Sequence, residues 1–312
     1  MQNRASPVSI SVVVPMHNEA LIVEELVRRT LKTCRIFARV QLILVDDGSS
    51  DQTWRKITEA AQSSSSITGI KLARNFGHQK AVLAGLDAVI YENVAIIDGD
   101  LQDPPELIPD MIEKMHANGV DIVYGQRITR KGESFFKRKS AELFYRMFSK
   151  IISFPIPLDV GDFRVFKNAV IPYLLESRDP SPFLRGLFAH TGLSAMPYIY
   201  EREARFAGES KYGLRKMFAF GFNAVFGFSD LPFRLFLRLA LVTMFVALIV
   251  SGYAIYHAVV TGSLPGWVSL FLLNLYMGSL NFLFLSLLGK YITLNFEISL
   301  KRPRWIVGEK IN

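Results

Sequence analysis

The chain has 312 residues, a net charge of +8 and one cysteine, and half of its residues are hydrophobic. This length allows one or two domains with a sizeable core, and the lone Cys34 excludes both a disulfide framework and a cysteine-based zinc site. A mean hydropathy of +0.24 is high for a soluble protein, and the excess is concentrated towards the C-terminus.

Strand and helix patterns alternate through the first 125 residues. Short apolar runs predict strands at Ser9–Val14, Gln41–Val45, Ile67–Leu72, Val94–Ile97 and Val120–Tyr124. Apolar residues at helical spacing predict helices over Ala20–Ile36, Thr53–Ala61, Gln79–Ile90 and Pro105–Asn118. Because strands and helices alternate, the sequence indicates an α/β fold with a doubly wound, mostly parallel sheet.

Asp98 and Asp100 follow the fourth predicted strand, in the run D-G-D-L-Q-D-P-P. Alternate residues of an extended chain point to the same side, so both carboxylates would face one spot. That spot lies at the carboxyl end of a strand, where open α/β sheets bind their ligands. Two hard oxygen ligands at this spacing suit Mg²⁺ or Mn²⁺ together with phosphates. The alternative is a plain turn, because Asp-Gly is common in turns.

A charge-free segment lies between Arg238 and Lys290. It is long enough for two membrane-crossing helices of about 20 residues each, and Gly and Pro interrupt it at residues 261–267. We therefore expect a hairpin of transmembrane helices near Phe236–Val260 and Val268–Gly289. Lys and Arg flank the outer ends and are absent from the connecting loop, which predicts that both termini are cytoplasmic. A buried soluble hairpin would need a polar face, which this segment lacks.

Basic residues are concentrated before this segment. Residues 1–126 contain 12 basic and 16 acidic residues, whereas residues 127–238 contain 19 and 10. Anionic headgroups or a lipid phosphate are better partners for that excess than nucleic acid, although an ordinary positive-inside bias explains it equally well. Amphipathic or aromatic-rich patterns over 128–153 and 217–236 predict interfacial helices; for the first, packing on the sheet is an equal alternative.

Polar clusters at three strand ends are followed by further short motifs. They are P-M-H-N-E at Pro15–Glu19, D-D-G-S-S-D at Asp46–Asp51, R-N-F-G-H-Q at Arg74–Gln79, D-G-D-L-Q-D-P-P at Asp98–Pro105, Y-G-Q-R at Tyr124–Arg127, G-D-F-R at Gly161–Arg164 and G-E-S-K-Y at Gly208–Tyr212. In this order they resemble family 2 glycosyltransferases with the nucleotide-sugar-binding A-type fold. With the predicted hairpin, the whole chain is similar to the polyprenyl-phosphate glycosyltransferases, which include dolichol-phosphate mannose synthases and bactoprenol glucosyltransferases.

The resemblance implies an activity and a domain plan. One hexose would pass from a nucleotide sugar, a UDP-hexose such as UDP-glucose, to polyprenyl (undecaprenyl) phosphate with inversion at the anomeric carbon. The parts would be a cytoplasmic transferase domain, a juxtamembrane amphipathic segment, the membrane hairpin and a cytoplasmic tail, at residues 1–212, 213–235, 236–290 and 291–312. The location would be a bacterial inner membrane, and the protein would form a homo-oligomer.

The resemblance also implies residues that bind the donor. Pro15 and Glu19 would line the base and ribose pocket, and Asp47 would accept a hydrogen bond from the base, since a carboxylate is an acceptor only. The alternative for Asp46 and Asp47 is to cap the loop before the next helix. Three residues would hold Mg²⁺ or Mn²⁺ against the diphosphate: Asp98, which also belongs to the nucleotide-sugar site, Asp100 and Gln102.

On the acceptor side, Asp162 is the candidate base and Asp159 the runner-up. A lipid monophosphate has a second pKa of about 6 and is largely dianionic at neutral pH. We therefore expect Asp162 to orient the acceptor or stabilise the positively charged sugar as much as to take a proton. Basic residues that would bind the acceptor phosphate are Arg127, Lys137, Arg138, Arg202, Arg205 and Lys211, with Arg127 and Lys211 also counted as catalytic.

Some alternatives stay open at this point. Any one of these basic residues could be a solvated surface charge. His17 and His78 could touch phosphate but, as lone histidines, are more often structural. The whole chain could be a non-catalytic membrane module that binds nucleotide sugar or lipid, or a transferase that glycosylates a hydroxyl of a glycan or protein.

Overall fold

The computed structural model describes residues 8–127, 160–177, 179, 182–201 and 266–312, with single positions between 238 and 260. These residues belong to two compact units, one of residues 1–219 and 303–312 and one of residues 220–302. The segments 128–153 and 217–236, for which interfacial helices are predicted, lie outside the described residues, as does the juxtamembrane segment 213–235.

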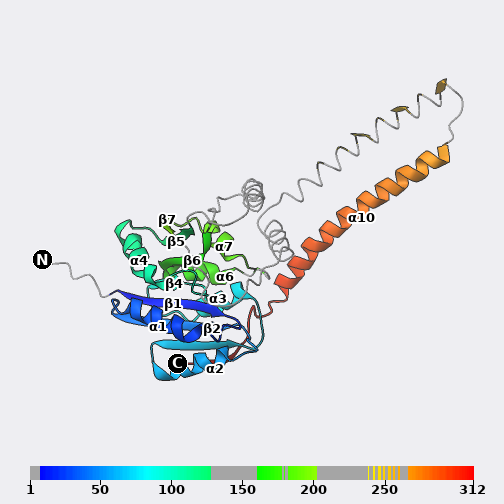
Figure 1. Ribbon diagram of the computed structural model, residues 1–312. Helices are drawn as coiled ribbons and strands as arrows, with labels where there is room; N and C mark the ends of the chain where they lie inside the picture. The colour runs from blue at the N-terminus through cyan, green and yellow to red at the C-terminus, as the bar shows by residue number, and fades with distance from the viewer. Residues whose placement is uncertain are drawn as a thin grey trace. The chain divides into compact units, whose positions relative to one another are not determined.

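A single sheet forms the centre of the first unit (Figure 1). In the described part of the chain its order is β7-β5-β6-β4-β1-β2-β3-β8. The strands are β1 Ser9–Met16, β2 Arg39–Asp46, β3 Ile67–Leu72, β4 Asn93–Ile96, β5 Ile122–Arg127, β6 Val160–Lys167, β7 Ala195–Tyr200 and β8 Val307–Ile311. Strand β1 is parallel to β2 and β4, β2 is parallel to β3, and β5 is parallel to β7. The predicted α/β fold with a mostly parallel sheet is confirmed.

Helices cover both faces of this sheet. They are α1 Val23–Cys34, α2 Thr53–Ser63, α3 His78–Leu86, η1 Pro105–Leu107, α4 Ile108–Ala117, η2 Asn168–Val170, α6 Ile171–Glu176 and α7 Leu184–His190. Because strand side chains alternate, Val12 and Val14 join the core on the side of α1, whereas Val13 faces α3. There α3 approaches closely: a Cβ on Gly85 would lie 2.4 Å from Val13 Cγ1. The central strands are thus buried on both faces, as parallel strands usually are.

The C-terminal tail returns to the first unit, where β8 pairs antiparallel with β3 at the sheet edge. The Trp54 indole on α2 donates a hydrogen bond to Glu309 at 3.0 Å. Arg304 donates to the carbonyl oxygens of Leu175 and Ser177 at the end of α6, at 2.7 and 2.6 Å. The sequence pattern predicts only a tail here, and the strand was missed because it depends on a partner far away in the sequence.

The second unit contains α10, Gly266–Ser299. This helix includes the one expected at Val268–Gly289 and continues beyond it. Among the residues that the structure describes, none of the helices has the length and apolar character needed to cross a membrane. Most of the other expected span, Phe236–Val260, lies outside the described residues. The transmembrane hairpin therefore stays a prediction.

Candidate functional site

The site lies at the edge of the sheet where the parallel strands β1, β2 and β4 end. Strand β6 is antiparallel to β4, and Ile96 pairs with Arg164. The first residues of β6 therefore lie beside the last residues of β4. This pairing brings Asp162 close to Asp98, although the two are far apart in the sequence.

Hydrogen bonds and close packing tie the strand-end loops together. The Asn18 backbone N–H donates to Ser49 Oγ at 2.9 Å, which joins the loops after β1 and β2. A Cβ on Gly99 would lie 3.1 Å from the carbonyl oxygen of Pro15, so the Asp98 loop packs against the end of β1. The three polar clusters noted in the sequence thus share one edge of the sheet.

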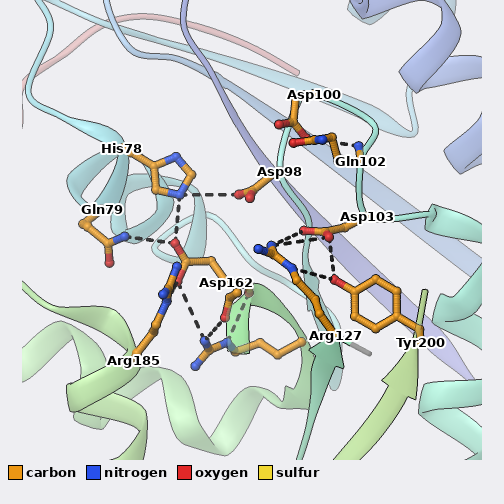
Figure 2. Close-up of polar contacts among 12 residues, drawn as sticks. His78, Gln79, Asp98, Asp100, Gln102, Asp103, Arg127, Asp162, Arg185 and Tyr200 are labelled. Atoms are coloured by element: carbon orange, nitrogen blue, oxygen red, sulfur yellow. Dashed lines mark hydrogen bonds and ion pairs between the residues drawn. The ribbon is translucent and has the colours of Figure 1, made fainter. Parts of the chain in front are cut away.

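Asp98 carries an oxygen that is short of hydrogen-bond donors. Among the described residues, Oδ1 is buried and has no hydrogen-bond partner, and His78 Nε2 lies 3.5 Å from it (Figure 2). Burial, opposed by the nearby charge of His78, raises the pKa of Asp98 to about 6. An oxygen of this kind gains much from a cation, so the site suits a bound metal ion.

Asp162, by contrast, is surrounded by donors (Figure 2). Its Oδ2 accepts hydrogen bonds from His78 Nε2 at 3.1 Å and Gln79 Nε2 at 3.0 Å. Its Oδ1 accepts one from Arg185 Nε at 3.1 Å, and Arg164 Nη2 lies 3.8 Å away. Burial alone would raise the pKa of Asp162, but the charges of Arg185 and His78 hold it well below its usual range. Asp162 is therefore an ionised, fully hydrogen-bonded carboxylate and a poor proton acceptor.

His78 links the two carboxylates, whereas the sequence favoured a structural role for it and it was not among the predicted site residues. Burial alone would lower its pKa, but the hydrogen bond with Asp162 and the charge of Asp98 raise the pKa of His78 to about 9. The imidazole is therefore positively charged at neutral pH. His78 begins α3 directly after Gly77, whose φ of +96° favours glycine. Its place at the end of R-N-F-G-H-Q, where a strand-end loop enters a helix, was the available sequence signal.

Three side chains with possible metal-ligand atoms meet at this edge of the sheet. Ligand atoms of His78, Asp98 and Asp162 lie within 4.8 Å of one another. As a trio they are a poor metal site, because His78 is protonated and Asp162 already binds Arg185. Asp98 fits a divalent cation better, together with Asp100, whose Oδ1 accepts the backbone N–H two residues further on at 3.1 Å (Figure 2). The predicted metal ligands Asp98, Asp100 and Gln102 stay a prediction.

Asp47 is buried at the end of β2 and holds the loop before α3. Its carboxylate accepts the backbone N–H groups of Phe76 and Gly77 at 2.7 and 2.9 Å. Burial raises the pKa of Asp47 despite these bonds. This is the loop-capping role considered as the alternative from the sequence. Each oxygen keeps a second lone pair, so the predicted contact with a nucleobase stays a prediction.

We expect Asp47→Ala to lower the free energy of unfolding by about 2 kcal/mol, because two N–H groups lose a charged acceptor. Urea denaturation of the purified protein measures this change. Asp87→Ala, at the exposed end of α3, is the control and should change stability by less than about 0.5 kcal/mol. Equal losses in the two variants would contradict the role of Asp47.

Arg127, predicted to bind the acceptor phosphate, ends β5 and lies beside Asp103 and Tyr200. Glu19 lies in the loop after β1, where its backbone N–H donates to Thr53 Oγ1 at 2.9 Å. The other predicted site residues lie outside the described part of the chain: Lys137, Arg138, Asp159, Arg202, Arg205 and Lys211.

Several known proteins are similar to this chain over nearly all of their own length. Residues 11–174 match the family model described as "Glycosyl transferase family 2". An uncharacterized glycosyltransferase of Bacillus subtilis (strain 168), YkcC, is 34% identical over 302 residues, which cover 96% of this chain and 93% of that protein. The prophage bactoprenol glucosyl transferase homolog of Escherichia coli (strain K12) is 33% identical, covering 96% and 98%. The bactoprenol glucosyl transferase of Shigella phage SfX is 32% identical, covering 96% and 99%.

Among solved structures, the similarity is weaker. Glucosyl-3-phosphoglycerate synthase from Mycobacterium tuberculosis, in complex with Mn²⁺, uridine diphosphate and glucosyl-3-phosphoglycerate, is 19% identical with a TM-score of 0.48. The match covers 68% of this chain and 76% of that chain.

Proposed function

The chain belongs to glycosyl transferase family 2, and from this membership we propose that it moves one hexose from a nucleotide sugar to polyprenyl phosphate. The donor is a UDP-hexose such as UDP-glucose, and the acceptor is undecaprenyl phosphate. The product is a lipid-linked sugar with inverted anomeric configuration. Support comes from relatives named bactoprenol glucosyl transferases, which align with 96% of the chain at 32–33% identity.

The hydrogen bonding of Asp162 is the observation that carries the choice of acceptor. Transfer to a sugar or protein hydroxyl needs a base that removes a proton, ideally with a pKa near the operating pH. Both oxygens of Asp162 accept hydrogen bonds from charged or amide donors, which favours the ionised form at all ordinary pH values. A phosphate monoester acceptor is already anionic. The geometry therefore favours an anionic acceptor over a hydroxyl.

Different residues of the site would act on the diphosphate of the donor and on the sugar that is transferred. Asp98 and Asp100 would hold the divalent ion, which when bound neutralises charge on the leaving diphosphate. His78 places a positive charge between Asp98 and Asp162, at 3.5 and 3.1 Å. Asp162 contacts the same imidazole nitrogen, Nε2, as Asp98, and its negative charge would stabilise the positively charged sugar as the donor bond breaks.

The membrane location is part of the same proposal. We infer that residues 236–290 form a two-helix hairpin in a bacterial inner membrane, with both termini in the cytoplasm. The absence of charged residues between Arg238 and Lys290 supports this. On α10, apolar side chains such as Leu270, Leu285 and Ile292 are 61%, 58% and 66% exposed, and a lipid environment would cover them.

The test is a transfer assay with the purified full chain in detergent. A panel of nucleotide sugars is supplied with undecaprenyl phosphate and Mg²⁺ or Mn²⁺. We expect release of nucleoside diphosphate only when both lipid phosphate and metal are present, and loss of release with EDTA. No release with any nucleotide sugar would favour the non-catalytic module. Release that does not depend on lipid phosphate would favour a hydroxyl acceptor.

A further inference from the structure

Asp103, Arg127 and Tyr200 form a buried polar cluster beside the site (Figure 2). The Tyr200 hydroxyl donates to Asp103 Oδ1 at 2.5 Å, and Arg127 Nη2 lies 3.3 Å from Asp103 Oδ2. Arg127 Nε donates to the Tyr200 oxygen at 3.3 Å. Asp103 is fully buried and Tyr200 is nearly so. The cluster therefore joins the loop that carries Asp98 to the ends of β5 and β7.

Two glycines leave space for this cluster. A Cβ on Gly161 would lie 2.4 Å from Arg127 Nη2 and 3.1 Å from its Cζ, so the guanidinium packs against the backbone just before Asp162. A Cβ on Gly125 would lie 2.9 Å from Tyr200 Cε1. Close packing against Gly161 and the contact with the Asp103 carboxylate both act on Nη2 and hold the guanidinium in one orientation, next to Asp162.

The loop that supplies Asp103 is bent at Leu101. Leu101 has φ +56°, a left-handed conformation that costs a residue with a side chain about 1–2 kcal/mol. Its side chain is almost fully buried, which offsets that cost. The bend lies between Asp100 and Asp103, and Asp103 beyond it meets Arg127. The backbone is thus strained in the loop that carries both the predicted metal ligands and Asp103, the partner of Arg127.

We propose that Asp103 and Tyr200 are positioning residues that hold Arg127 so that its guanidinium binds the phosphate of the lipid acceptor. This inference rests on the proposed function. Nε and Nη2 of Arg127 are held by the cluster, and 13% of the side chain stays exposed for an anion. A guanidinium binds phosphate through a planar fork of N–H groups, so its orientation decides how well it binds. Burial and the Asp103 carboxylate raise the pKa of Tyr200, so the hydroxyl keeps the proton that it donates.

The first test compares ligand affinities in Asp103→Asn and Tyr200→Phe. The probe is farnesyl monophosphate, a short isoprenyl phosphate, and UDP binding is measured beside it. We expect farnesyl phosphate affinity and kcat/KM for the lipid phosphate to fall about ten- to hundredfold in Asp103→Asn and about three- to tenfold in Tyr200→Phe. UDP affinity and KM for the nucleotide sugar should stay within about threefold of wild type. A merely structural role would weaken both ligands together.

The matched control is Tyr198→Phe, on the same strand, whose hydroxyl contacts Asp110 at 3.3 Å on the surface. It should leave both affinities unchanged. A double variant then tests whether Asp103 acts through Arg127. With Arg127→Ala already present, Asp103→Asn should lower farnesyl phosphate affinity by less than about a further twofold. Losses that multiply independently would overturn the proposal, as would unchanged farnesyl phosphate binding in Asp103→Asn.

These readouts separate this inference from the proposed function. Wild-type protein that binds farnesyl phosphate but transfers no sugar would contradict the proposed function, while the binding data would still decide the role of Asp103. Wild-type protein that binds no farnesyl phosphate would overturn the inference itself.

Discussion

Asp98→Asn is expected to reduce turnover about 1,000-fold or more. The substitution keeps the shape of the side chain but removes the charge of a buried oxygen that, among the described residues, has no hydrogen-bond partner. The variant should bind a divalent ion poorly and lose the metal dependence of UDP binding. Transfer assays and calorimetry with Mn²⁺ and UDP measure the two effects. Metal-dependent turnover near the wild-type rate would show that Asp98 does not hold the ion.

The same substitution should stabilise the metal-free protein. Burial raises the pKa of Asp98 to about 6, so between about pH 4 and 6 the folded protein binds a proton that the unfolded chain has released. The stability that this proton contributes is present at low pH and is lost as the pH rises through 6. At pH 7.5 the ionised carboxylate therefore destabilises the fold, and asparagine removes that cost.

Thermal unfolding in EDTA measures this second effect. We expect the Tm of Asp98→Asn to exceed that of wild type at pH 7.5 by a few degrees, about 1 kcal/mol or more. At pH 5, where Asp98 is largely protonated, the difference should shrink. The exposed Asp87→Asn serves as the control and should change neither the turnover nor the Tm. A lower Tm for Asp98→Asn at pH 7.5 would contradict the sign of the effect.

The sequence predicted the first five strands because their apolar runs are continuous and short. Strand β6 was missed because Asp162 and Arg164 interrupt its apolar pattern, and both side chains are buried as a pair. A buried ion pair in a strand has the same local pattern as a solvated turn. Strand β8 was missed for a different reason: its V-G-E-K-I run becomes a strand by pairing with β3, and no local pattern contains that contact.

The site was predictable only in its separate parts. Polar clusters after parallel strands indicated one common edge of the sheet, and the structure confirms that arrangement of the loops. The meeting of Asp98 with Asp162 depends on the antiparallel pairing of β6 with β4, which has no sequence signature of its own. His78 and Arg185 become site residues only through that pairing, because both bind the carboxylate that β6 brings in.

Asp162→Asn is expected to lower kcat about 100- to 1,000-fold while KM for the nucleotide sugar changes little.

The variant should also be less stable by about 3 kcal/mol, because Arg164 is buried and loses its negative partner. The pKa of Asp162 lies well below its usual range, so this stabilisation is present above about pH 4 and is lost as the pH falls below that value. Wild type and variant should therefore approach each other in stability in acid. Asp121→Asn, which breaks a surface pair with Lys167, is the control and should cost less than about 1 kcal/mol.

The pH dependence of the kcat loss separates an orienting carboxylate from a general base. If Asp162 took a proton with a pKa near 7, wild type would be partly inactive at pH 6, and the loss on substitution would be smaller there than at pH 8. A carboxylate held ionised by Arg185 and His78 is unchanged across that range. We therefore expect the ratio of wild-type to Asp162→Asn turnover to be the same at pH 6 and pH 8. A ratio that grows with pH would make Asp162 a base and would reopen a hydroxyl acceptor. Turnover near the wild-type level would remove Asp162 from the mechanism.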